Sequence, residues 1–325
     1  MPDAYQVRLP TVPDRHCRAL AGASHRQGSG RPWPVAQVLI SKYQDHQPLY
    51  RQETLYQRSG IALSRSTLAG WVGACGVALQ PLVDALRTHL LGHSVLHADE
   101  TPVAVLAPGL GRTHRAYLWA YRNGPHTTAP AVVFDFQMSR AGKHAQGFLQ
   151  GYQGALMVDD YAGYKALFAA GSITELACLA HVRRKFFELH AANKSLVTAQ
   201  ALEHIARLYQ IERQAAGLSA SERQALRMTE AKPILDAWRV WLIHTRGRVP
   251  DSSGTARAID YALRRWTALT RYLDDGTYPI DNNPVENAIR PVALGRKNWL
   301  FADTESAGRR VVAIQSSVAW VCQPG

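Results

Sequence analysis

The hydrophobic period of the sequence changes twice along the chain, and these changes divide it into helical and β-rich parts. Between residues 94 and 160, turn residues separate four short runs rich in β-branched and aromatic residues: SVLHADET, HRAYLWAYRN, AVVFDF and ALMVDD. The segment AGKHAQGFLQGY before the fourth run has a helical pattern, and ELACLAHV (175–182) is a candidate fifth strand. Strands followed by strand, helix and strand predict an α/β fold with a mixed sheet covered by helices.

Helical patterns lie on both sides of this sheet. Residues 35–93 follow the helical period, with Ser64 as an expected N-cap and several glycines that interrupt the run after it. Helix, glycine turn and helix are typical of a DNA-reading helix-turn-helix, but ordinary antiparallel helix pairs have the same pattern. Residues 184–277 are also helical, with the capping box SASE, and predict a large all-helical insertion. Residues 1–34 show no period and are expected to form a loose tail.

The balance of charge narrows the partners of such a chain. Its formal net charge of +12 favours a polyanion, with nucleic acid before an anionic membrane surface. No apolar run reaches the roughly 18 residues that a membrane helix needs, so no membrane span is expected. The cysteines, Cys17, Cys75, Cys178 and Cys322, lie far apart without a CxxC pair. That spacing argues against a disulfide scaffold and fits a reducing cytosol.

Two acidic residues follow apolar runs that a sheet would bury. Asp99 closes the first run and Asp159 closes the fourth. Carboxylates at strand ends project at the edge of a sheet, where α/β proteins place their sites, although acids also end strands as ordinary turn formers. The setting that the two acids share favours an arrangement in which both face one site.

A third carboxylate, Glu286, lies in the stretch DNNPVENAIRPVALGRKNWLF. Asn283 as N-cap, Pro284 at the first helical position and Glu286 at the third form a capping arrangement. Glu286 also has Arg290 one turn further on as a possible ion-pair partner. We expect the apolar face of this short helix to pack on the sheet and Pro291 to end or kink it early. Spacing alone leaves a capped surface helix and a catalytic site equally open.

Clustered carboxylates repel one another unless a cation neutralises them. Hard divalent ions such as Mg²⁺ take oxygen ligands, usually one or two carboxylates together with water and phosphate. Two such ions can clamp the attacking and leaving oxygens of a phosphodiester displacement. A basic surface around an acidic pocket is what the cleavage of DNA or RNA requires.

Two basic clusters lie beside aromatic residues. HVRRKFF contains Arg183, Arg184 and Lys185 just after the candidate fifth strand, and RKNW contains Arg296 and Lys297. Arg and Lys next to aromatic rings suit phosphate contacts combined with packing against bases or sugars. A solvated face is the competing interpretation, and it is stronger for the first cluster than for the second.

The spacing Cys178-x-x-His181 is that of half a metal site. The sequence offers no second pair of ligands, whereas structural zinc sites bind four Cys or His side chains. We therefore expect a histidine with satisfied hydrogen bonds near the sheet edge rather than a zinc ligand.

Several longer stretches are together similar to transposases of the insertion sequence 66 family, which belong to the DDE, RNase-H-like class. They are SKYQDHQPLYRQETLYQRSGIALSRSTLAGWVG, VLHADETPV, VDDYAGYKAL, CLAHVRRKFFE and DNNPVENAIRPVALGRKNWLF, within about residues 36–316. Several motifs in the same order are far more specific than one acidic triplet. The resemblance implies an RNase-H-like mixed sheet with flanking helices, a large all-helical insertion and an N-terminal helical region.

The resemblance also implies roles for single residues. Asp99, Asp159 and Glu286 match the catalytic acids, which would bind two Mg²⁺ or Mn²⁺ ions. His181 lies in a region similar to a Cys/His signature that follows the second acid in several DDE superfamilies, and we expect it and Asn283 to support the site. With the first basic cluster included, the expected DNA-binding positions are Arg183, Arg184, Lys185, Arg290, Arg296 and Lys297.

The implied organisation has five parts along the chain. They are a loose tail (1–34), a helical, helix-turn-helix-like region (35–93), the first part of the catalytic core (94–183), the helical insertion (184–277), and the last part of the core (278–325).

The implied reaction is a two-metal phosphoryl transfer. Water hydrolyses a strand at the transposon end, and the freed 3′-hydroxyl then attacks target DNA in line. The implied partners are DNA at the transposon ends and at the target, a homo-oligomer on DNA and accessory transposition proteins, with no membrane. The expected location is the bacterial cytoplasm, in association with the nucleoid.

The chain departs from the family pattern at three places. The second acid is followed by Asp160, where the family usually has Gly, so the register between Asp159 and Asp160 stays open, with Asp159 preferred. Residues 1–34 resemble nothing in the N-terminal region of the family, and the similarity stops after about Ser317. These departures predict a copy truncated or frameshifted at both ends. A non-catalytic DNA-binding remnant and a related RNase-H-like nuclease are therefore alternatives to an active transposase.

Overall fold

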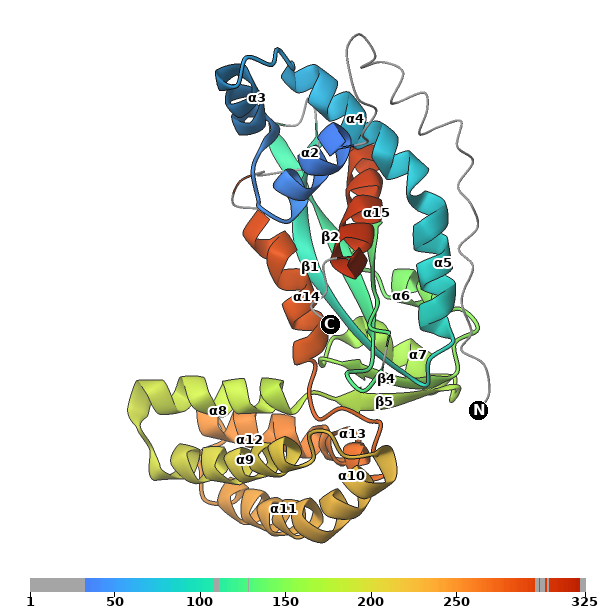
Figure 1. The fold of residues 1–325 in the computed structure, drawn as a ribbon. Coiled ribbons are helices and arrows are strands. Elements are labelled where there is room, and N and C mark those ends of the chain that lie inside the picture. The colour runs from blue at the N-terminus through green and yellow to red at the C-terminus, as the bar shows by residue number, and fades with distance from the viewer. Residues whose placement is uncertain are drawn as a thin grey trace, which may run out of the picture.

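A computed structural model describes residues 33–321, apart from 108–110, 128, 296–297, 299–301 and 303. The predicted loose tail therefore lies almost wholly outside the described residues. Figure 1 shows a body built on a β-sheet and, below it, a body made only of helices. The chain passes from the sheet into the helical body at α8 and returns at α14.

The sheet has five strands in the order β3-β2-β1-β4-β5. β1, β2 and β3 pair antiparallel, whereas β4 is parallel to both β1 and β5. This mixed α/β sheet is the predicted RNase-H-like arrangement, and the four predicted β-rich runs are strands. The strands are β1 (Val95–Ala107), β2 (Arg112–Asn123), β3 (Val132–Gln137), β4 (Gly154–Val158) and β5 (Ile173–Ala177).

Two predictions about strand ends are wrong. The candidate fifth strand stops at Ala177, and its second half begins helix α8 (Leu179–Asn193), with Cys178 as the N-cap. Asp99 does not close a strand, because β1 continues through Pro102 to Ala107. β1 pairs with β4 only as far as His97. Among the described residues, this edge of β1 then has no partner until the bridge between Val105 and Ala302, and an open edge tolerates proline.

Helices cover both faces of the sheet, as the alternation of apolar residues requires. Leu96 and Ala98 of β1 share a core cluster with α5 (Gln80–Leu91), α6 (Lys143–Phe148) and α7 (Lys165–Ala169). Val103 and Val105 share another with α14 (Asn283–Gly295) and α15 (Glu305–Val321) on the opposite face. A 3₁₀ turn, η1 (Ala162–Tyr164), precedes α7.

The N-terminal region is helical, as predicted, and consists of α2 (Trp33–Tyr43), α3 (Leu49–Arg58), α4 (Arg65–Ala78) and α5. Ser64 is the N-cap of α4 and accepts a hydrogen bond from the Thr67 backbone N–H, which confirms the prediction. A glycine turn does separate α3 from α4, at Gly60 with φ 76°. The glycines expected to interrupt the run after Ser64 instead lie inside α4. Gly76 is one of them, and a Cβ there would lie 2.6 Å from the Arg310 Cβ. Glycine at this position therefore lets α4 pack closely against α15.

The helical body has its own core, centred on the fully buried Trp238. The predicted capping box at Ser219 and Glu222 is present. The helical body consists of α8, α9 (Leu196–Gln214), α10 (Ala220–Leu226), the π-helical turn η2 (Arg227–Ala231), α11 (Lys232–Arg246), α12 (Gly254–Arg264), α13 (Trp266–Thr270) and η3 (Arg271–Leu273).

Helix α14 packs on the sheet as predicted, with Val285, Ile289 and Val292 buried against it. Pro291 does not end this helix, which continues to Gly295. In the described part of the chain, no single helix is both long and apolar enough to cross a membrane. Only α4 and α5 taken together, with a bend of 43° between them, have the length and apolar composition of a membrane span.

Candidate active site

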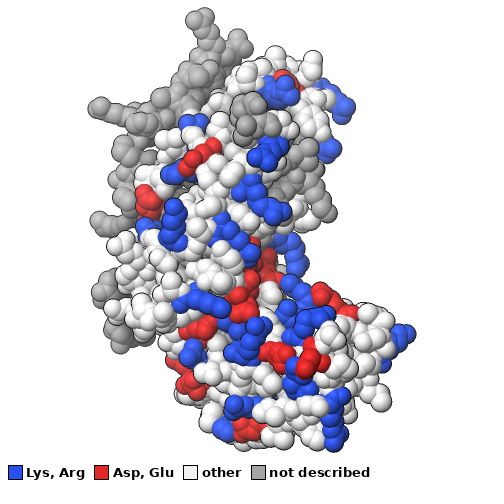
Figure 2. Space-filling view, turned by 180° about the vertical axis from the view of Figure 1, so that it is seen from behind, with Lys and Arg blue, Asp and Glu red and all other residues white. Residues whose placement is uncertain are grey.

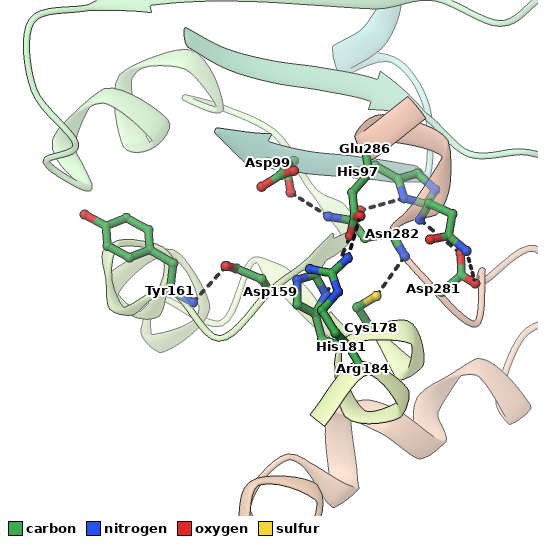
Figure 3. A network of polar contacts seen from close by, with 12 residues as sticks. His97, Asp99, Asp159, Tyr161, Cys178, His181, Arg184, Asp281, Asn282 and Glu286 are labelled. Carbon is green, nitrogen blue, oxygen red and sulfur yellow. Dashed lines mark hydrogen bonds and ion pairs between the residues drawn. The ribbon is translucent and has the colours of Figure 1, made fainter. Parts of the chain in front are cut away.

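The pairing of β1 with β4 brings the first two acids to one point. The last registered pair is His97 with Met157, so Asp99 and Asp159 each lie two residues further along adjacent parallel strands. The carboxyl ends of such strands open a crevice where α/β proteins bind ligands. Figure 3 shows the Asp99 and Asp159 side chains in the same region as Glu286, which comes from α14. The structure thus brings together three carboxylates from distant parts of the sequence.

The start of α14 differs from the predicted cap. The carbonyl of Asn282 accepts the Glu286 N–H at 3.2 Å, so Asn282 is the N-cap and Asn283 is the first helical residue. Asn282 turns its side chain inward, where Nδ2 donates to the Ala98 carbonyl and Oδ1 lies 2.9 Å from His97 Nδ1. These contacts fix the first turn of α14 directly onto β1.

Glu286 is consequently the fourth helical residue, beyond the position that a capping box uses. Its carboxylate is 3.2 Å from Arg184 and 3.7 Å from His181, both on α8, instead of pairing with Arg290. The capping arrangement predicted for Glu286 is therefore wrong. Its side chain, 23% exposed, instead faces the start of the helical body.

The surroundings of Asp99 disfavour the ionised form of its carboxyl group. Burial raises the pKa of Asp99 to about 8, and the negative charges of Glu100, Asp159 and Glu286 add to this effect. The hydrogen bond that Asp99 Oδ1 accepts from the Glu100 N–H, at 2.9 Å, opposes the shift only partly. Glu286 Oε1 is buried and has no hydrogen-bond partner among the described residues. Carboxylate oxygens gathered in this way are the kind of ligands that a hard divalent cation prefers.

Asp159 and Asp160 have different surroundings. The Asp159 carboxylate accepts the Tyr161 N–H at 2.8 Å and contributes to the raised pKa of Asp99. The Asp160 carboxylate lies 3.5 Å from Arg265, which follows α12 in the helical body. Arg265 also donates to the Asp159 carbonyl at 3.2 Å and pairs with Glu175 of β5. Asp160 therefore faces a structural ion pair, whereas Asp159 faces the other acids.

Sequence reasoning missed two residues beside the acids. Glu100 is buried and accepts hydrogen bonds from Arg140 Nε at 2.7 Å and from the Tyr164 hydroxyl at 2.8 Å. Burial raises the pKa of Glu100, and these donors oppose the rise. The Arg140 guanidinium also lies 3.8 Å from the centre of the Tyr161 ring. The adjacency of Glu100 to Asp99 was visible in the sequence, but nothing there linked Glu100 to Arg140.

Cys178, His181 and Glu286 form a second group of potential metal ligands, since one donor atom of each lies within 4.8 Å of the others. His181 Nδ1 is buried without a hydrogen-bond partner in the described part of the molecule, so the expectation of a satisfied histidine is wrong. Burial lowers the pKa of His181, while Glu286 opposes this. The Cys178 thiol accepts the Asn282 N–H at 3.1 Å, and burial raises its pKa to about 12.

The predicted DNA-binding residues separate in space. Arg183 and Arg184 line one groove of the helical body, whereas Lys185 lies over the Tyr261 ring and lines another. Arg290 is exposed on α14. The predictions for Arg296 and Lys297 fall outside the described residues. Figure 2 shows acidic side chains gathered where the two bodies meet, bordered by basic ones.

Comparisons with known proteins agree with this architecture. A family model described as "Transposase IS66 family" matches residues 31–310. The chain is similar to three proteins of Sinorhizobium fredii, each described as an uncharacterized protein. Identity is 39% to y4qI over 306 residues, which are 90% of this chain and 56% of that protein. Identity to y4hP is 36% over 307 residues, which are 89% of this chain and 55% of that protein. Identity to y4jD is 35% over 296 residues, which are 87% of this chain and 58% of that protein. The chain thus spans a little over half the length of these relatives.

Proposed function

Since the chain belongs to the IS66 family of transposases, we propose that it cleaves DNA strands and joins them at transposon ends, with Asp99, Asp159 and Glu286 as its catalytic acids. The observation that carries this proposal is the register of β1 and β4. It sets Asp99 beside Asp159, and the packing of α14 on β1 and β2 adds Glu286. Three carboxylates that the cationic side chains of the described residues do not fully neutralise repel one another and lower the free energy of unfolding. Such unfavourable clusters are concentrated at functional sites.

The three acids suit two Mg²⁺ or Mn²⁺ ions, which when bound would polarise the scissile phosphate and favour attack by water or a 3′-hydroxyl. Asp99 would lose its proton on binding, since burial and then neighbouring negative charge raise its pKa, and a bound cation would offset both. Arg184 and His181 would hold Glu286 in place from α8. Asn282 would fix the direction in which α14 presents Glu286, with Asn283 supporting that turn through its bonds to Asp281.

Asp159 is the second acid in this proposal, and Asp160 has a structural role. The ion pair of Asp160 with Arg265 supports this assignment, because that carboxylate already has a cationic partner. Arg265 also holds the backbone of Asp159, so the helical body would help to position the second acid.

DNA would approach over the basic surface around the acids. Arg183, Arg184 and Arg290 are exposed near Glu286 and would contact phosphates, which position DNA without reading its sequence. Lys185 would contact phosphates on the other side of α8. Arg296 and Lys297 remain predicted phosphate contacts, by their place after α14 in the sequence.

The test is a strand-cleavage assay on DNA that carries the inverted repeats flanking the gene. The purified chain is expected to nick this DNA and join it to a second duplex in Mg²⁺ or Mn²⁺, and Asp99→Asn is expected to abolish both reactions. Salt-dependent binding without cleavage in either metal would support a non-catalytic DNA-binding protein instead. A preference for RNA–DNA hybrids over repeat ends would support an RNase-H-like nuclease.

A further inference from the structure

A groove runs between α8 and α9 in the helical body. On α8, its wall is a stripe of residues at helical spacing, Ala180, Arg183, Arg184 and Phe187. Facing it on α9 are Ala206, Tyr209 and Arg213, and Asn283 of α14 also lines the groove. The groove has a volume of about 570 Å³, within the range of roughly 300–1,000 Å³ typical of ligand-binding pockets.

The residues that line the groove favour a negatively charged ligand. Three of its lining residues are arginines, and no carboxylate is among the lining residues in the described part of the chain. The Tyr209 hydroxyl donates to Asp281 at 2.8 Å, so this polar group is already engaged by the protein. Arginine guanidinium groups, which bind phosphate through paired N–H donors, are then the main groups left for a ligand.

The exposed ring of Phe187 further limits the class of ligand that suits the groove. The Phe187 side chain is an aromatic group left 50% exposed on the wall of a charged groove, with the Arg183 guanidinium 5.4 Å from the centre of its ring. Aromatic rings beside arginines form the platforms on which proteins stack the bases of single-stranded nucleic acid. Inside duplex DNA the base faces are covered by neighbouring pairs, so at an internal position a nucleotide must be unpaired to stack on Phe187.

The position of the groove connects it to the acids. Arg184 lines the groove and is also 3.2 Å from the Glu286 carboxylate. Asn283, which also lines the groove, is in the first turn of α14, the helix that carries Glu286. A strand whose backbone follows the arginines would therefore arrive at Asp99, Asp159 and Glu286.

We propose that the groove between α8 and α9 binds unpaired nucleotides of the DNA strand next to the cleavage site, with one base stacked on Phe187 and phosphates held by Arg183 and Arg213. This inference rests on the proposed DNA cleavage and adds a substrate class to it, namely DNA with locally unpaired bases. Separating a base from its stack costs free energy, and the Phe187 platform recovers part of it.

The test compares two DNAs of equal phosphate number, a blunt duplex and a duplex with a short single-stranded tail. Affinities are measured by fluorescence anisotropy with the full chain, in EDTA to prevent cleavage and at one salt concentration. The wild type is expected to bind tailed DNA about ten-fold more tightly, as expected for one stacked base. Phe187→Ala is expected to remove this preference without changing the affinity for blunt DNA.

Phe187→Trp and Val240→Ala are the matched variants. The tryptophan should keep the preference, and its fluorescence should be quenched by tailed DNA but not by blunt DNA. Val240 is 69% exposed on α11, outside the lining of the groove, and its truncation should leave both affinities unchanged. Arg213→Ala should weaken both complexes and lower the salt slope by about one unit.

Two results would overturn the inference: equal wild-type affinity for the two DNAs, or a preference that survives in Phe187→Ala. Binding in EDTA requires no catalysis, so the groove can pass this test even if the chain never cleaves DNA. Conversely, cleavage by a chain without any preference for tailed DNA would remove the groove proposal alone.

Discussion

At the scale of a single side chain, the contacts of Glu286 distinguish a capping role from a catalytic one. Its carboxylate faces Arg184 and His181 rather than backbone N–H groups of its own helix. Exchange to Gln keeps the shape of the side chain and removes the charge that a cation needs. We therefore predict that Glu286→Gln unfolds within a few degrees of the wild type, because a half-exposed ion pair contributes only about 0–1 kcal/mol, yet loses metal-dependent cleavage.

Thermal unfolding and a cleavage assay on the same preparation check this prediction. A large drop in the unfolding temperature with cleavage retained would restore the capping interpretation of Glu286. Asn287→Ala, on the exposed side of the same turn, is the matched control and should change neither measurement.

The raised pKa of Asp99 predicts how the free energy of unfolding depends on pH in the metal-free protein. Burial, reinforced by Glu100, raises the pKa of Asp99 to about 8, compared with about 4 in an unfolded chain. Between these values the folded protein holds a proton that the unfolded chain has released. The contribution of Asp99 is thus fully present below about pH 4 and is lost as the pH rises through about 8.

Urea unfolding in EDTA at pH 5 and pH 8 measures this effect. The midpoint is expected to be lower at pH 8, and Asp99→Asn is expected to reduce the difference. Mg²⁺ should restore stability at pH 8 more than at pH 5, because it competes with the proton for Asp99. An identical pH dependence in the wild type and in Asp99→Asn would contradict the account.

At the scale of elements, Arg265 ties the helical body to the sheet. Its side chain, 10% exposed, contacts Asp160, the Asp159 carbonyl and Glu175. We predict that Arg265→Ala lowers the free energy of unfolding by about 3 kcal/mol, because a largely buried guanidinium is removed and the partly buried carboxylates of Asp160 and Glu175 lose their partner. It should also raise the Mg²⁺ concentration needed for cleavage, since the backbone of Asp159 loses a hydrogen bond.

Arg309→Ala is the control for this prediction. Arg309 is 65% exposed and pairs with Glu305 one turn away on α15, so its loss should cost no more than about 0.5 kcal/mol. Denaturant unfolding of both variants gives the comparison. Equal destabilisation by the two exchanges would show that Arg265 is not a special link between the bodies.

The packing of α4 on α15 gives a second test at this scale. An added Cβ at Gly76 would lie 2.6 Å from the Arg310 Cβ and 2.9 Å from the Arg310 carbonyl oxygen. Gly76→Ala is therefore expected to destabilise the protein by about 1–3 kcal/mol. Gly70, in the same helix, has open space around it, so Gly70→Ala should stabilise by up to about 1 kcal/mol. The same sign for both exchanges, measured by thermal unfolding, would contradict this packing.

For the whole molecule, the change of hydrophobic period was enough to predict a mixed sheet followed by a helical insertion. Period-two runs fix where strands lie, and capping residues such as Ser64 fix where helices begin. The prediction failed at the end of β1, because Pro102 signals a break unless one edge of the strand is open. That open edge follows from the short pairing with β4, which local patterns do not contain.

The candidate site was only partly accessible from the sequence. The resemblance supplied Asp99, Asp159 and Glu286, but the partners of Glu286 lie about a hundred residues away on α8. The choice of Asp160 as a structural residue likewise depends on Arg265, which no local spacing relates to it. Contacts between the two bodies are long-range, so they require the tertiary structure.

The central claim is that Asp99, Asp159 and Glu286 together bind the catalytic cations. Anomalous diffraction from crystals grown with Mn²⁺ and an uncleaved DNA end tests it most directly. The account predicts Mn²⁺ density bounded by these three carboxylates, and its loss in Asp99→Asn. Density confined to Cys178 and His181, or no density at the three acids in a DNA-bound complex, would contradict it.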